Sequence, residues 1–249
     1  MGTPGFEHVM LFVQSNTAAY GGQFAKAREL ARRAAESAQR ADEKEVVAGY
    51  QARAALREAL VGNVTLAKQQ AQAGLALSDG RDVEALLALV LGLAGDEGQA
   101  RRLANNLSER FAENTVVQFN YLPTIRAAVA LQGHDAGKAI EVLEPALPYE
   151  LGQTALTPHP IYVRGQAYLA THQGPAAVAE FQKILDHPGL VTNSTIGALA
   201  HLQLGRAYAL QGDTAKAKAA YQDFLTLWKD ADPDIPILKQ AKAEYAKLQ

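Results

Sequence analysis

The sequence predicts an all-α fold, a right-handed α-solenoid of about six helix pairs that ends in a C-terminal capping helix. Helix-forming residues dominate the 249 positions, and runs of β-branched residues are few. Alanines recur at intervals of 33 to 40 residues, with glycines in the turns that precede most of them. These alanines are Ala27, Ala67, Ala100, Ala139, Ala177 and Ala217. Near-regular spacing of this length indicates stacked helical units.

The clearest unit lies near the C-terminus and has the spacing of a tetratricopeptide (TPR) repeat. Gly205, Tyr208, Ala217 and Tyr221 follow the L-G-x2-Y…A-x3-aromatic pattern of that helix–turn–helix unit. Glycine and alanine allow two antiparallel helices to approach closely, and the aromatic rings fill the space beside them. The same four positions recur 40 residues earlier as Gly165, Tyr168, Ala177 and Phe181. The sequence therefore predicts a single TPR-like domain over residues 1–249.

Helix-breaking glycines and helix-capping residues divide the first half of the chain into three helix pairs. Gly21 and Gly22 end the first helix, and Gly62 ends the third. Asp96 is suited to cap the helix that follows it. The first repeat is expected at 6–40, with helices at 6–19 and 24–40, and the second at 43–78, with helices at 42–60 and 64–77. The third is expected at 82–111, with helices at 82–93 and 97–111. The basic residues of 24–40 indicate either a patch for an anionic partner or a solvated face with pairs such as Glu29–Arg33.

Prolines indicate where helices are interrupted in the second half of the chain. Pro123 falls inside the helix expected from 114 to 131 and should kink it or delay its start. Pro148, Pro158 and Pro160 lie in the longest loop, 147–160, a length that is often functional or disordered. The remaining repeats are expected at 115–146, 160–187 and 193–229, followed by a polar capping helix at 234–248.

Composition excludes several classes of function. The net charge is −2, which argues against a general nucleic-acid binder, and the absence of cysteine excludes disulfides and thiol catalysis. The six histidines have no metal-ligand spacing, and no hydrolase or dinucleotide motif is present. We therefore expect no catalytic residue, no metal and no cofactor. The longest apolar run, 85–95, is about half of the roughly 20 residues that a membrane helix needs, and Met1–Pro4 lack a signal-peptide pattern.

Several strings in the later two-thirds resemble a known family. They are VQFNYLPTIR at 117–126, PYELG at 148–152, YVRGQAYL at 162–169, EFQKILDH at 180–187, LGRAY at 204–208 and LTLWKDADPD at 225–234. The chain is similar there to the C-terminal TPR region of bacterial, acidobacterial-type eukaryotic-like serine/threonine protein kinases. That resemblance implies a signalling module, extracytoplasmic if it follows a membrane kinase and cytoplasmic otherwise. Kinase motifs are absent, so no kinase activity is implied. Similar repeats also follow DNA-binding domains in bacterial regulators.

Two functions follow as hypotheses. The first is a non-catalytic interaction or scaffold module that binds a peptide or protein segment in its concave groove. The alternative is a small-molecule-sensing or regulatory domain, or an enzyme, with a site near the 147–160 loop.

Polar and aromatic residues on the expected inner helices give a candidate binding cluster. We expect a carboxylate-bearing peptide to contact Asn120, Tyr121, Arg126, Tyr149, Tyr162, Arg164, Gln166 and Arg206. The 149–152 loop should pass close to them. In the alternative interpretation, Arg126 pairs with Glu150 and the tyrosines hold the loop against the solenoid.

Overall fold

The computed structural model describes residues 6–248, and these residues are helical without a strand. The first six helices are α1 (Glu7–Tyr20), α2 (Phe24–Arg40), α3 (Lys44–Leu60), α4 (Val64–Leu75), α5 (Arg81–Leu93) and α6 (Glu97–Arg110). A π-helical turn η1 (Val117–Tyr121), α7 (Leu122–Gln132), α8 (Ala136–Val142) and a 3-10 segment η2 (Glu144–Tyr149) follow. The rest are α9 (His159–Ala170), α10 (Gly174–Asp186), α11 (Pro188–Val191), α12 (Thr195–Leu210), α13 (Thr214–Leu227) and α14 (Pro236–Ala246). The all-α, repeat-like prediction is confirmed. The expectation for Met1–Pro4 lies outside the described residues.

Each helix pair turns in the same way. A residue with positive φ stands five positions before each of the six recurring alanines, and all six alanines are buried. The turn residues are Gly22, Gly62, Gly95, His134, His172 and Gly212. Histidine replaces glycine in two of the six turns, although glycine adopts this left-handed conformation at the lowest cost. Asp96, Asp135 and Asp213 then cap α6, α8 and α13 by accepting a backbone N–H.

The glycine–aromatic contacts predicted from the TPR spacing are present. A Cβ on Gly205 would lie 2.8 Å from Cδ2 of Tyr221, and one on Gly165 would lie 2.6 Å from Cε1 of Phe181. Both aromatic rings are buried, and Ala217 and Ala177 have no exposed surface. Small residues on one helix thus admit a ring from its partner.

The fourth pair departs from regular helix at Pro123. Its first helix contains the π-helical turn Val117–Tyr121, and regular α-helix begins only at Leu122. Proline cannot donate a hydrogen bond to the preceding turn, and Thr124 Oγ1 donates to the carbonyl of Asn120 (2.6 Å). The second helix of this pair, expected to reach 146, ends at Val142 and continues as η2.

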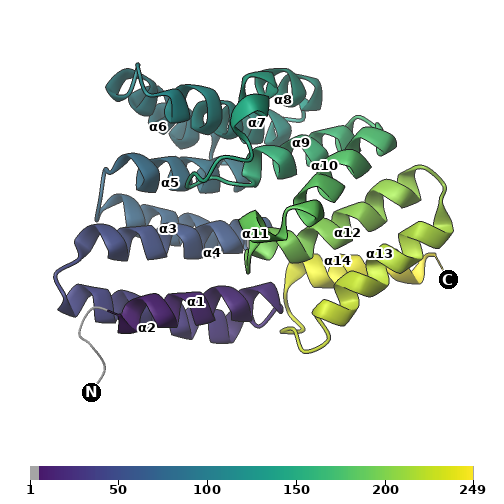
Figure 1. Cartoon of the computed structure of the whole chain (residues 1–249), viewed down its shortest axis with the longest axis horizontal. Coiled ribbons are helices and arrows are strands. Elements are labelled where there is room, and N and C mark those ends of the chain that lie inside the picture. The colour runs from purple at the N-terminus through teal and green to yellow at the C-terminus, as the bar shows by residue number, and fades with distance from the viewer. Residues whose placement is uncertain (1–5, 249) are drawn as a thin grey trace.

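The last repeat and the C-terminal capping helix contact the first two helix pairs. Trp228 Nε1 donates to the carbonyl of Tyr20 (2.9 Å), and the Asp232 carboxylate accepts the N–H of Ala25 (2.6 Å). The N–H of Ile237, at the start of α14, donates to the carbonyl of Val61 (3.2 Å). The pairs therefore form a closed circuit in which α12 and α14 lie beside the first repeats (Figure 1).

The chain also fills its own interior. Leu156, from the proline-rich loop, has no exposed surface and belongs to the core cluster formed mainly by α3, α5 and α7. The short helix α11 lies near the centre of the circuit (Figure 1). The loop and α11 therefore occupy part of the space inside the circuit. Among residues 6–248, no helix combines the length and apolarity required to cross a membrane.

Candidate functional site

The eight predicted binding residues do not share one surface. Asn120, Tyr121, Tyr162 and Arg164 are buried. Gln166 and Arg206 are half-buried, and only Arg126 and Tyr149 are exposed. The buried residues make internal contacts, described next, that give each of them a structural role.

Arg164 holds the loop against α10. Its Nη2 donates to Glu150 (2.6 Å) and to Glu180 (2.5 Å), and Lys183 also donates to Glu150 (2.9 Å). Burial opposes the charge of Arg164, but its hydrogen bonds with these carboxylates and their charges raise the pKa of its guanidinium above the usual value. The suggested Arg126–Glu150 pair is wrong, because Glu150 pairs with Arg164 and Lys183.

Tyr162 and Arg206 belong to a second internal network. Gln203 Nε2 donates to the Tyr162 hydroxyl (2.9 Å), and burial raises the pKa of that tyrosine. Arg206 donates twice to the carboxylate of Glu244 in α14 (2.9 Å each), and the Tyr221 hydroxyl donates to the same carboxylate (2.9 Å). This network joins the sixth pair to the last helix.

Asn120 and Tyr121 make a third set of internal contacts, which confirms that the loop passes close to the predicted cluster. Asn120 Nδ2 donates to the carbonyl of Tyr149 (3.3 Å), and the Tyr121 hydroxyl accepts the N–H of Ala155 (3.2 Å) while donating to Asp82 (3.0 Å). Burial raises the pKa of Tyr121 to about 12. Tyrosine and asparagine thus tie the loop to α5 and η1.

An outer groove between α2 and α4 is a better candidate for partner binding. Its volume is about 320 Å³, and α3 supplies its floor. Ala31, Ala35, Ala54 and Ala73 line it from all three helices. Their small side chains leave room that larger residues would fill, and the volume falls at the lower end of the roughly 300–1,000 Å³ typical of ligand pockets. We call this space the α2–α4 groove.

Two buried polar atoms in the α2–α4 groove have no partner. The amide oxygens of Gln51 in α3 and Gln70 in α4 accept no hydrogen bond from the described residues. An unsatisfied buried acceptor typically costs about 1–3 kcal/mol. Both oxygens are almost inaccessible to solvent, so a ligand with N–H groups would remove that cost once the glutamine side chains turn towards it. The groove then offers apolar contact together with two hydrogen-bond acceptors.

Two of the arginines that line this groove, Arg28 and Arg32, are already paired. Arg28 donates to both carboxylate oxygens of Glu58 (2.8 and 2.9 Å). Arg32 pairs with Glu29 and with Glu36. Two of the basic residues of α2 are therefore ion-paired here, and the i,i+4 partner expected for Glu29 is replaced by Arg32 at i,i+3. No sequence motif marks this groove, because its signal is only the absence of large side chains at spaced positions.

Arg126 lies outside both the internal networks and the α2–α4 groove. It lines a second outer groove between α6 and α8, about 510 Å³ in volume, together with Glu97, Arg101, Asp135 and Lys138. Acidic and basic residues are mixed along this groove, so its electrostatic potential favours neither an anionic nor a cationic ligand.

Comparison with known proteins assigns no family. No protein-family model and no curated protein matches this chain. Within residues 6–248, no group of three or more histidine, aspartate or glutamate side chains could hold a metal ion.

Proposed function

We propose that this chain is a non-catalytic interaction module of the TPR type that binds a peptide or protein segment within a larger bacterial signalling protein. The α2–α4 groove, with its two unpartnered amide oxygens, carries the proposal. It replaces the buried inner cluster as the expected place of binding. The sequence resemblance to the repeat region of bacterial serine/threonine kinases supports the signalling context.

An extended segment suits this groove better than the side of a helix. The N–H groups in the middle of a helix are already bonded within it, whereas an extended chain has N–H groups free to donate to the oxygens of Gln51 and Gln70. Apolar side chains of the same segment would contact the alanines. The proposed partner is therefore an extended peptide with small or medium apolar side chains.

A random twelve-residue peptide library displayed on phage tests the proposal. The library is selected on the folded chain, and enriched peptides are synthesised and titrated against variants. Ala73 is exposed at the groove, so Ala73→Trp fills the space without disturbing the core. We expect this variant to lose binding, and Gln51→Leu with Gln70→Leu to weaken it by roughly tenfold for each 1.4 kcal/mol of hydrogen bonding lost.

The matched control is Asn105→Trp, which places the same side chain at an exposed position of the second outer groove. Enriched peptides should bind this variant as they bind the unmodified chain. Failure to enrich any peptide would contradict the proposal, and so would equal binding to Ala73→Trp and Asn105→Trp.

A second candidate function is sensing of a small molecule near the 147–160 loop. A specific observation supports it, because Ala155, Thr157 and His159 line a central pocket with residues of α1, α3, α5 and α12. This pocket is separate from the loop's ionic contacts with α10.

A further inference from the structure

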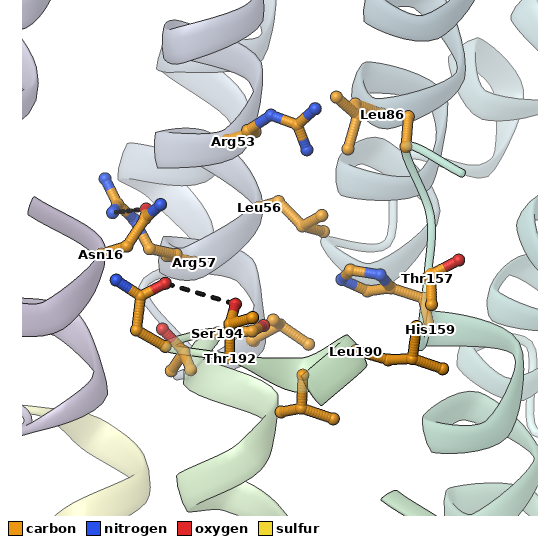
Figure 2. A pocket seen from close by; sticks show the side chains of 15 residues that line it. Asn16, Arg53, Leu56, Arg57, Leu86, Thr157, His159, Leu190, Thr192 and Ser194 are labelled. Carbon is orange, nitrogen blue, oxygen red and sulfur yellow. Dashed lines mark hydrogen bonds between the residues drawn. The ribbon is translucent and has the colours of Figure 1, made fainter. Parts of the chain in front are cut away.

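The central pocket lies where five segments of the closed circuit meet, and its volume is about 200 Å³. Its wall carries two arginines, Arg53 and Arg57 of α3, and no aspartate or glutamate. Arg53 reaches across the pocket towards Leu86, and His159 faces it from another wall (Figure 2). The pocket therefore has an excess of positive charge.

Arg53 has no partner. The residue is exposed to solvent, and among residues 6–248 none accepts a hydrogen bond from its guanidinium or forms an ion pair with it. Asp82 interacts with its charge, but that carboxylate accepts hydrogen bonds from Arg81 (2.7 Å) and from the Tyr121 hydroxyl (3.0 Å). The guanidinium retains all its donors for a ligand.

Arg57 is a buried cation that forms no ion pair among the described residues, although the charge of its neighbour Glu58, which pairs with Arg28, partly offsets the effect of burial. Only 8% of the residue is exposed, and its single hydrogen bond goes to the neutral side chain of Asn16 (2.8 Å), above the ring of Phe12. Burial lowers the pKa of Arg57 to about 10. Removing a charge from water is unfavourable unless an opposite charge compensates it, so the surroundings of Arg57 favour an anion nearby.

The start of α12 adds a further donor that the fold leaves unused. Thr195 is 2% exposed, lines the pocket, and its hydroxyl has no hydrogen-bond partner. It is the first residue of a 16-residue helix, and Ser194 at the N-cap makes no side-chain capping bond. The partial positive charge of the helix terminus therefore adds to that of the arginines.

The remaining wall mixes polar side chains, such as Thr157, His159 and Asn193, with an apolar part that limits the size of a ligand. Leu56, Leu60, Leu86 and Leu190 line the pocket beside the polar groups. Its volume is below the roughly 300 Å³ at which pockets for drug-sized ligands begin. An inorganic anion would leave these leucines without contact, whereas a short aliphatic chain would cover them.

We propose that the central pocket binds a small free organic acid, whose carboxylate is held by Arg53 and the Thr195 hydroxyl in the field of Arg57. Its short aliphatic chain contacts the leucines. This proposal specifies the ligand class for the second candidate function, small-molecule sensing near the 147–160 loop. It rests on that function and not on peptide binding in the α2–α4 groove.

Calorimetric titration and thermal shift test the site with acetate, butyrate and hexanoate at up to about 10 mM. Butyramide serves as the neutral match for butyrate, and inorganic phosphate as the inorganic anion. A short peptide with a free C-terminal carboxylate distinguishes a peptide terminus from a free acid. We expect saturable binding of butyrate or hexanoate and none of butyramide.

Two variants separate binding from folding. Arg53→Gln should weaken acid binding by roughly tenfold or more, and Thr195→Val by a few-fold, because each removes a donor to the carboxylate. Thr195→Val should melt no lower than the unmodified chain without ligand, since its hydroxyl makes no bond to lose. Arg33→Gln, at an exposed arginine of α2, is the matched control and should bind normally.

Four results would overturn the proposal: no saturable binding of any acid, unchanged binding in both variants, phosphate binding as tightly as butyrate, or binding of the peptide terminus without the free acids. Loss of peptide capture at the α2–α4 groove would not affect this test, so the two proposals fail separately.

Discussion

The contact between Gly165 and Phe181 offers the sharpest test of the repeat packing. We predict that Gly165→Ala destabilises the fold although alanine is the better helix former. The added Cβ would lie 2.6 Å from both Cε1 and Cζ of Phe181 and 3.2 Å from Cδ1. Ordinary carbon–carbon contact begins near 3.5 Å, so the ring or the helix must move by most of an ångström.

The magnitude follows from two opposing effects. Replacing glycine by alanine inside a helix contributes about 1 kcal/mol of stability. Overpacking a well-filled core costs roughly 1–3 kcal/mol, or more where the neighbour cannot move. Phe181 is fully buried and packs edge-on against Tyr162 at 5.9 Å, so the overpacking should prevail. We expect a net loss of about 1–2 kcal/mol, or roughly 2–8 °C in melting temperature for a chain of this size.

Gly49→Ala is the matched control. Gly49 lies inside α3, and a Cβ there would meet no atom within 4 Å. This variant should gain about 0.5–1 kcal/mol. Urea unfolding followed by circular dichroism measures both, and Gly165→Ala should cost much less in a Phe181→Leu background. Equal stabilisation by both glycine substitutions would refute the packing argument.

Three further predictions concern single side chains. Arg164→Met should cost up to about 3–5 kcal/mol in urea unfolding, because it leaves the buried carboxylates of Glu150 and Glu180 with only the half-buried Lys183 as a cation, and glutamine at both partners should recover part of the loss. Burial lowers the pKa of His159 from 6.5 to about 4. Between these two pH values the imidazole is therefore protonated in the unfolded chain and neutral in the folded chain. Stability should therefore fall by up to roughly 3 kcal/mol as pH drops from about 6.5 to 4, and His159→Gln should flatten that part of the profile. Trp228→Phe should cost about 1 kcal/mol by removing the hydrogen bond to the Tyr20 carbonyl. Trp228 is the only tryptophan, so its fluorescence reports on this contact alone. We expect its emission and the circular dichroism signal to change at the same urea concentration. A change in emission at lower urea would show that the last repeat separates from the first before the helices unfold.

The helix pairs could be predicted because their determinants are local in sequence. A turn residue, a cap and a small residue at fixed offsets specify a helix–turn–helix unit, and Gly212, Asp213 and Ala217 show all three. The effect of Pro123 was also visible, because proline lacks the N–H that a regular helix requires. The π-helical form of that turn could not be predicted, since it depends on how the loop packs onto it.

The closure of the circuit could not be predicted from the sequence. It rests on contacts between residues about 200 positions apart, such as Trp228 with Tyr20 and Asp232 with Ala25. These side chains look like ordinary helix ends when they are considered alone. Four of the eight predicted binding residues are buried for a related reason, since a tyrosine or arginine on an inner helix serves a partner or a core network according to what covers it. Arg164 is covered by the loop that carries Glu150.

Arg57 connects the two proposed sites, because its side chain lines both the central pocket and the α2–α4 groove. An acid bound in the central pocket would attract the guanidinium inward, and the outer groove would then lose part of its wall. We therefore predict that butyrate weakens the binding of peptides selected on the groove. Linkage requires the peptide to weaken butyrate by the same factor, about fivefold or more for a typical coupling energy. Titration of each ligand with and without the other measures this factor, and Arg57→Met should abolish it. Binding of each ligand that is independent of the other would show that Asn16 and Phe12 fix Arg57 in place.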